Sequence, residues 1–142
     1  MMTIRIDDMD WKHGIREQAV FKVDYDTHRN NPIQRFNFRL KYMLKYMYFI
    51  TYAKVLVFKT KKGFHFYIYP KYGPAVKKGY TMKPEFVIMS QLILGSDWLR
   101  ELRNLNRAVI YHDDNWNLLF SDKSKSGREQ HERFYCAYVI KR

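Results

Sequence analysis

The chain has 142 residues, which is the length of one domain with one hydrophobic core. Its apolar content of 46% excludes a globally disordered protein. Lys and Arg outnumber Asp and Glu by 26 to 14, and the net charge of +12 favours a polyanionic partner such as nucleic acid or a nucleotide. The one cysteine excludes an internal disulfide and a Cys-based zinc site within the chain.

The chain shows neither a secretory signal nor an apolar stretch of membrane-spanning length, so we expect a cytoplasmic protein without a membrane partner. A richness in Lys, Tyr and Ile would also suit a virus- or plasmid-encoded protein. Aromatic residues make up 18% of the chain, and rings mixed with basic charge suit phosphate contact and base stacking. The same rings could instead fill the core, with the lysines only keeping the protein soluble.

The first half of the chain predicts one strand, one helix and then two strands. Residues 19–26 (AVFKVDYD) form an apolar run that ends on acids, which indicates a strand. Residues 33–48 have apolar side chains at intervals of three and four, which indicate a helix. Residues 54–59 and 64–69 predict two strands joined by a glycine-bearing turn of hairpin length, and Pro70 is expected to end the second one.

The second half predicts two short helices and then further strands. After a basic loop, residues 84–94 and 97–105 read as helices separated by a Gly-Ser break. Residues 107–112 and 116–120 read as two strands around an acidic turn, and residues 134–140 as a last strand.

This order predicts an α+β fold of βαββαβ type, RRM-like or ferredoxin-like, as a single domain over residues 1–142. Two helices would cover one face of the sheet, and extra C-terminal strands would follow. The first and third strands would be neighbours at the sheet centre. The other face of the sheet would stay open for a ligand.

The strand at residues 19–26 carries the most informative pair of side chains. Asp24 and Asp26 are two residues apart, so on a strand both carboxylates lie on one face. Carboxylates that close together repel unless a cation lies between them, and Mg²⁺ or Mn²⁺ prefers oxygen ligands. The pair therefore predicts a two-metal phosphoryl-transfer site, although acids also occur at strand ends simply because turns begin there.

The strand at residues 64–69 would meet that pair. If Phe64 and Phe66 face the core, His65 and Tyr67 lie on the open face beside Asp24. The imidazole could then hold a triphosphate together with the neighbouring lysines, or it could be a solvated histidine or one whose hydrogen bonds are satisfied within the protein. The lysines are Lys59, Lys61 and Lys62.

The hhhDhD run ending at Asp26 and the T-x-x-G-x-H run ending at His65 together resemble the archaeo-eukaryotic primase (prim-pol) superfamily. The resemblance implies an RNA-recognition-motif-like core and a minimal primase-like nucleotidyltransferase that uses two divalent metals. It also implies that Asp24 and Asp26 bind the metals and that His65 contacts the phosphates of the incoming nucleotide. Asp97 is the candidate for the third acid, with Asp113 and Asp114 as rivals and Asp122 behind them.

The same resemblance implies a single-stranded template or primer-template and nucleotides as partners, and it leaves room for a helicase or other replication partner. The template backbone would be contacted by basic side chains of the predicted helix at residues 97–105 and of the basic loop that precedes residue 84. These are Arg100, Arg103, Lys71, Lys77 and Lys78.

Three other functions stay open. In a non-catalytic RRM-like binding module, Phe64 and Phe66 would face outward and stack on bases. A rolling-circle replication initiator would need a His-x-His pair, whereas this strand carries Phe-His-Phe. A structural or interaction protein would need neither chemistry nor nucleic acid.

Overall fold

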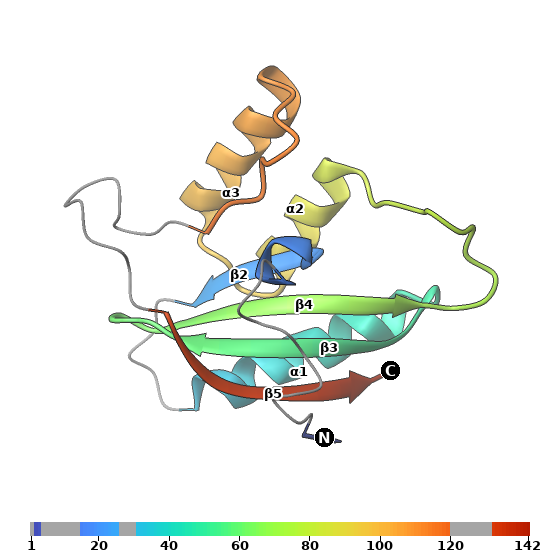
Figure 1. Ribbon diagram of the computed structural model, residues 1–142, viewed down its shortest axis with the longest axis vertical. Coiled ribbons are helices and arrows are strands. Elements are labelled where there is room, and N and C mark those ends of the chain that lie inside the picture. The colour runs from blue at the N-terminus through green and yellow to red at the C-terminus, as the bar shows by residue number, and fades with distance from the viewer. Residues whose placement is uncertain (1, 4–14, 26–30, 120–131) are drawn as a thin grey trace.

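The computed structural model describes residues 2–3, 15–25, 31–119 and 132–142 (Figure 1). Asp26 and Asp122 therefore lie outside the described residues. The strands are β1 (Met2–Thr3), β2 (Phe21–Tyr25), β3 (Ile50–Lys59), β4 (Phe64–Tyr72) and β5 (Arg133–Lys141). The helical elements are the 3₁₀ turn η2 (Ile15–Gln18), the helices α1 (Pro32–Tyr46), α2 (Pro84–Ile93) and α3 (Trp98–Leu105), and the π-helical turn η3 (Asn106–Ile110).

The sheet confirms the predicted fold class, an α+β fold of open ferredoxin-like type. Its strand order is β1-β5-β3-β4-β2 and each neighbouring pair is antiparallel. The predicted neighbours β2 and β4 are paired, and Asp24 is opposite His65 in the register. The strand order differs from the expected one: β2 lies at an edge of the sheet rather than at its centre, because β5 pairs with β3 and not with β2.

The hydrophobic core lies between one face of this sheet and the helices α1 and α2. Alternate residues of the strands β2, β3, β4 and β5 point into it, as the period of two requires, and α1 contributes one apolar stripe at intervals of three and four. From β4 the core takes Phe66 and Ile68, and from β2 it takes Phe21 and Val23, all of them fully buried. The strand phase that the sequence predicted for β4 is therefore confirmed.

Two predicted strands are absent from the described part of the chain after α3. Residues 107–112 were expected to form a strand, but 106–110 continue α3 as a π-helical turn. Residues 116–119 are irregular rather than a strand. The apolar run Ala108–Ile110 fits either structure, and short apolar runs do not distinguish the two by periodicity. The fourth long strand of the fold is β5 instead, at the end of the chain.

Pro70 was expected to end its strand, but β4 continues to Tyr72 and Pro70 pairs with Ala53 of β3. The pairing of β4 with β2 covers only residues 64–68 of β4, so no strand of the described sheet lies on the other side of Pro70. A proline is tolerated there because its missing N–H would face an open edge.

The predicted break between α2 and α3 is confirmed at Gly95. This residue has φ of +102°, and a Cβ atom there would lie 2.7 Å from Cε1 of Tyr25. Both the backbone conformation and the close approach of the ring require glycine. Asp97 then begins α3, since its carboxylate accepts a hydrogen bond from the backbone N–H of Arg100 at 3.2 Å.

The second face of the sheet is less open than expected. A smaller apolar cluster lies on it, in which Phe58 and Tyr67 pack near Ala19, just after the turn η2. The guanidinium of Arg16, from that turn, lies 4.9 Å from the centre of the Phe58 ring. Figure 1 shows η2 in front of the sheet and α2 and α3 standing together beside the β2 edge. None of the helices in the described ranges is long and apolar enough to cross a membrane.

Candidate functional site

Asp24 and His65 meet on the second face of the sheet, as the sequence predicted. The Asp24 Oδ1 atom lies 3.5 Å from Nε2 of His65. The other ring nitrogen, Nδ1, is bound by a carboxylate oxygen of Glu132, just before β5. His65 is only 2% exposed. Both nitrogens of this imidazole are therefore engaged inside the protein, and neither points to a solvent-exposed phosphate site.

The two carboxylates keep His65 protonated. Burial alone would lower the pKa of the imidazole, but the hydrogen bonds and negative charges of Asp24 and Glu132 outweigh it and raise the pKa to about 9. At neutral pH the site therefore holds an imidazolium between two acids. A cationic ring so placed is typical of a structural ion-pair network, and it is also typical of an active site with shifted titration.

Glu132 was not predicted as a site residue. Its carboxylate also accepts a hydrogen bond from the hydroxyl of Tyr67 and forms an ion pair with Arg16. Burial raises the pKa of Glu132, but the hydrogen bonds from His65 and Tyr67 and the positive charges of His65 and Arg16 together bring it below its usual value. Glu132 stands 67 residues after His65, at the end of a polar stretch, so no local pattern links it to this histidine.

The acids expected to bind metal do not gather around Asp24. Asp97 is the N-cap of α3, and Asp113 accepts a hydrogen bond from the backbone of Asn115 at 2.9 Å. Asp114 follows in the same turn. Within the described residues, no group of three or more His, Cys, Asp or Glu side chains could hold a metal ion. The described acids therefore do not fit a two-metal centre, and Asp26 lies outside the residues that would test it.

Arg100 was expected to contact a template, but it is buried between α3 and the segment at 116–119. Its guanidinium donates to the carbonyl of Leu118 at 2.9 Å and to the hydroxyl of Ser96 at 2.9 Å, and it forms an ion pair with Glu101. Glu101 in turn accepts from the side chain of Gln91 at 2.6 Å. The N–H groups of Arg100 that a phosphate would need are therefore already hydrogen-bonded within the protein. Arg100 stabilises the packing of α3 instead of contacting a template.

The same region covers the open edge of β2 with side-chain amides. Gln91 Oε1 accepts from the backbone N–H of Lys22 at 2.9 Å, and the side-chain amide of Asn117 donates to the carbonyl of Val20 at 3.2 Å. An exposed strand edge can pair with another chain, and these amides satisfy it without a further strand. The helices α2 and α3 are thus attached to the sheet through polar contacts.

The remaining basic side chains lie at different places on the surface. Lys59, Lys61 and Lys62 are exposed around the turn between β3 and β4. Lys71, Lys77 and Lys78 are exposed at the opposite end of that hairpin, and Arg103 is exposed on α3. The structure therefore does not bring the predicted phosphate and template contacts into one site with His65 and Tyr67.

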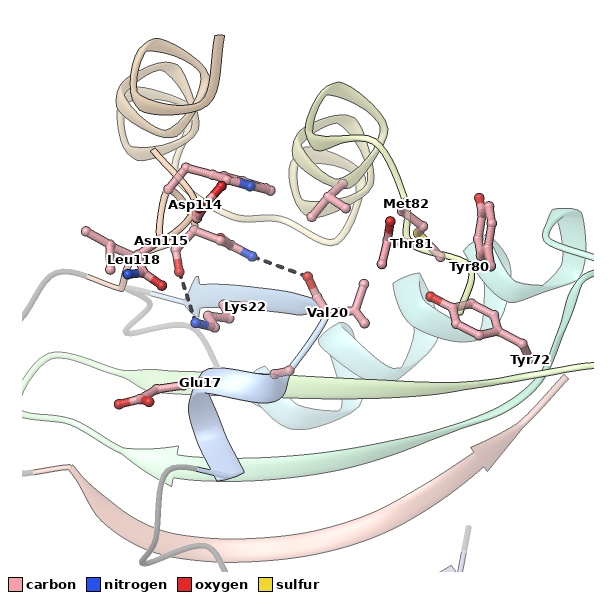
Figure 2. A pocket seen from close by; sticks show the side chains of 14 residues that line it. Glu17, Val20, Lys22, Tyr72, Tyr80, Thr81, Met82, Asp114, Asn115 and Leu118 are labelled. Atoms are coloured by element: carbon pink, nitrogen blue, oxygen red, sulfur yellow. Dashed lines mark hydrogen bonds between the residues drawn. The ribbon is translucent and has the colours of Figure 1, made fainter. Parts of the chain in front are cut away.

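A cavity of about 570 Å³ lies between the start of β2 and residues 114–118. Figure 2 shows the side chains that line it, with Tyr72 and Tyr80 on the far side. The ammonium group of Lys22 points into it and donates to the carbonyl of Asn117 at 3.0 Å. Burial lowers the pKa of Lys22. Glu17 and Asp114 also line the cavity, so its charges do not favour a phosphate-bearing ligand.

The outer face of α1 combines exposed rings with basic charge. Phe38, Tyr42 and Tyr46 follow one another at intervals of four, so they form one stripe along the helix. Phe38 is 74% exposed. Lys41 and Lys45 lie along one side of this stripe, and Arg35 and Arg39 lie along the other. We call these seven residues the α1 face.

The α1 face also borders a groove. A cavity of about 590 Å³ lies between α1 and β5, and it is lined by Phe38 and Lys41 on one side and by Lys141 on the other. The helix contains no acidic residue. Aromatic rings, basic side chains and a groove thus occur together on this helix. The sequence had not predicted a binding site there. The signal was the i, i+4 spacing of aromatic residues on the polar side of a helix.

The outward-stacking alternative for β4 is contradicted by the structure. Phe66 is fully buried and its ring stacks on Phe36 of α1, with centroids 3.8 Å apart. Phe64 is half-buried and packs against Tyr135. The sheet therefore does not present this pair of rings to bases.

Comparison with known proteins found no matching family model, no matching curated protein and no matching solved structure.

Proposed function

We propose that this protein binds single-stranded nucleic acid on the α1 face. The observation that carries the proposal is the stripe of Phe38, Tyr42 and Tyr46 between two rows of basic side chains. Tyr42 and Tyr46 pack edge-to-face on each other, with ring centroids 5.4 Å apart, but all three rings keep more than half of their surface exposed, and bases could stack on it. Flanking cations would follow the phosphates on either side of the bases.

An unpaired strand suits this face better than a duplex does. The three rings are spaced by one helical turn each, so successive bases could stack along the helix. Bases in a duplex are already stacked on each other and cannot reach the rings. The groove beside Phe38 offers space for a strand that crosses from α1 towards Lys141. The net charge of +12 supports long-range attraction of a polyanion to the protein.

Fluorescence anisotropy with labelled single-stranded DNA and RNA, and with a duplex of the same sequence, tests the proposal. Phe38→Ala and Tyr42→Ala should each weaken single-strand binding by about 5- to 150-fold, because a stacked ring contributes about 1–3 kcal/mol. Tyr111→Ala is the control variant, since Tyr111 is 71% exposed but lies after α3, away from the α1 face.

Equal weakening by Tyr111→Ala and Phe38→Ala would contradict the proposal, because binding would then not depend on where the ring lies. If only Lys61→Gln and Lys62→Gln weaken single-strand binding, the nucleic-acid site would lie at the turn between β3 and β4. Absence of binding at low salt would reject nucleic acid as the partner.

A second candidate function is primase-like nucleotidyl transfer with Mg²⁺ or Mn²⁺. It rests on the pairing of Asp24 with His65 across β2 and β4, two residues to which the resemblance to primases gives site roles. Against it stand the engaged nitrogens of His65 and the lack of a group of metal ligands among the described residues. The test is nucleotide incorporation on single-stranded DNA and RNA templates, primed and unprimed, with and without each metal. Metal-dependent synthesis that disappears in Asp24→Ala and Asp26→Ala would support it. Synthesis that is unchanged in both variants, or no synthesis, would reject it.

A further inference from the structure

The helix α3 has its polar side turned inward and its apolar side turned outward. Arg100, Glu101 and Asn104 are buried on the side that contacts the rest of the protein. Trp98 and Leu102 are one turn apart on the opposite side, and they are 63% and 52% exposed. A surface helix normally shows the reverse pattern.

The apolar surface extends beyond α3 on both sides along the chain. Leu99 belongs to the same side of the helix, and Val109, Ile110 and Tyr111 follow in and after the π-helical turn η3. In α2, which packs against α3, Met89, Leu92 and Ile93 are also exposed. We call the exposed apolar residues of 89–111 the α3 face.

We propose that the α3 face is the contact between two copies of this chain in a symmetric dimer. The exposed fractions of the six side chains from Trp98 to Tyr111 correspond to on the order of 600 Å² of apolar surface. The largest apolar patch on a typical monomer is about 300–600 Å², and a standard interface covers roughly 800 Å² per partner. With the exposed residues of α2 added, the area of the α3 face reaches the roughly 800 Å² that one partner contributes to a standard interface.

The charge distribution also favours a second copy as the occupant. Residues 84–119 contain three arginines and five acids, a formal net charge of −2, whereas the whole chain carries +12. Two copies would repel each other if their basic surfaces came together, and contact through this region avoids that repulsion. A two-fold axis would place equal patches against each other, which gives a closed dimer instead of an open chain of molecules.

The dimer would leave the three rings of the α1 face accessible in both copies, because none of them belongs to the α3 face. The two faces adjoin only where Arg39 donates a hydrogen bond to the carbonyl of Ile93 at 3.2 Å, among the contacts of the described residues. The inference does not depend on nucleic-acid binding, and either proposal can fail without the other.

Sedimentation velocity of the full chain over a wide range of protein concentrations tests the proposal, at a salt concentration that screens the net charge. We expect a reversible monomer–dimer equilibrium. The variant Leu99→Glu with Leu102→Glu should be monomeric at every concentration at which the parent protein is dimeric, because it places four carboxylates in the contact. Phe38→Glu, an equally drastic change on the α1 face, should leave the equilibrium unchanged.

Circular dichroism checks that each variant stays folded. If the double variant does not fold, oxidation of Leu102→Cys provides an independent test, since residues near a two-fold axis can form a disulfide between copies; Phe38→Cys is its control. A monomeric parent protein, or a dimer that dissociates with Phe38→Glu and not with the double variant, would overturn the proposal. If α3 instead contacts a different protein, the parent protein would also be monomeric in this experiment, and the dimer proposal would be rejected.

Discussion

The helices α1 and α3 both expose aromatic or apolar side chains, but their surroundings differ. On α1 the rings lie between four basic side chains, and the opposite side of the helix is buried in the core. On α3 the exposed charges are Asp97 at its start and Arg103, one of each sign, and the buried side is a network of polar groups. The comparison shows that exposed apolar area alone does not identify a partner. We base the two proposals on the charges beside it: basic side chains would suit a polyanion on α1, and the lack of a basic excess would suit a second apolar surface on α3.

The largest expected effect concerns the network that holds α3 in its inverted orientation. Replacing Glu101 with Ala leaves the buried guanidinium of Arg100 without its carboxylate. We expect a loss of about 3–5 kcal/mol in the free energy of unfolding, measured by urea denaturation. Glu85→Ala, at an exposed position in the first turn of α2, is the control and should change little. A loss similar to that of the control would mean that the network does not stabilise α3.

The second prediction concerns pH and the cluster around His65, which belongs to neither face. Its folded pKa of about 9 lies above the unfolded value of 6.5, so its contribution to stability is complete below pH 6.5 and is lost as the pH rises through 9. That difference corresponds to about 3 kcal/mol, which thermal denaturation between pH 6 and about 9.5 should detect.

His65→Gln provides the control for that experiment, because a variant without the imidazole should lose most of this pH dependence. In the folded variant, single-strand binding at constant pH should stay unchanged, since the α1 face does not include His65. Reduced binding in His65→Gln would instead place the ligand on the sheet and weaken the distinction between the two faces.

The smallest expected effect is a change in salt dependence. Removing one cation that binds a phosphate of the single strand should reduce the slope of log K against log salt by about 0.7. Lys41→Gln and Lys45→Gln should each produce such a change in anisotropy titrations at several salt concentrations. Arg103→Gln, on the exposed side of α3, should not. Equal changes in all three variants would indicate binding by total charge rather than by the α1 face.

Much of the fold could be predicted from local pattern. The alternation in Phe-His-Phe placed Phe66 in the core and His65 on the other face, and the pairing of β2 with β4 brought His65 to Asp24. Local pattern did not reveal Glu132, because a partner 67 residues away leaves no periodic signal. It is this carboxylate, with Asp24, that occupies both nitrogens of His65.

The orientation of α3 could not be predicted for a different reason. The spacing of Leu99 and Leu102 defines an apolar side, and such a side is normally assigned to the core. The inward side is polar here because Arg100 and Glu101 neutralise each other and bind Ser96 and Gln91. A periodic pattern gives the two sides of a helix but not which of them is buried.

Ultraviolet cross-linking of a single-stranded oligonucleotide to the full chain, followed by mapping of the attached peptides, tests the central claim most directly. Stacked rings lie against the bases, so we predict that the cross-links fall on Phe38, Tyr42 and Tyr46 of α1. Cross-links concentrated on Tyr67 or Tyr69 of the sheet, or on Trp98 and Tyr111 of the α3 face, would contradict the assignment of nucleic-acid binding to α1.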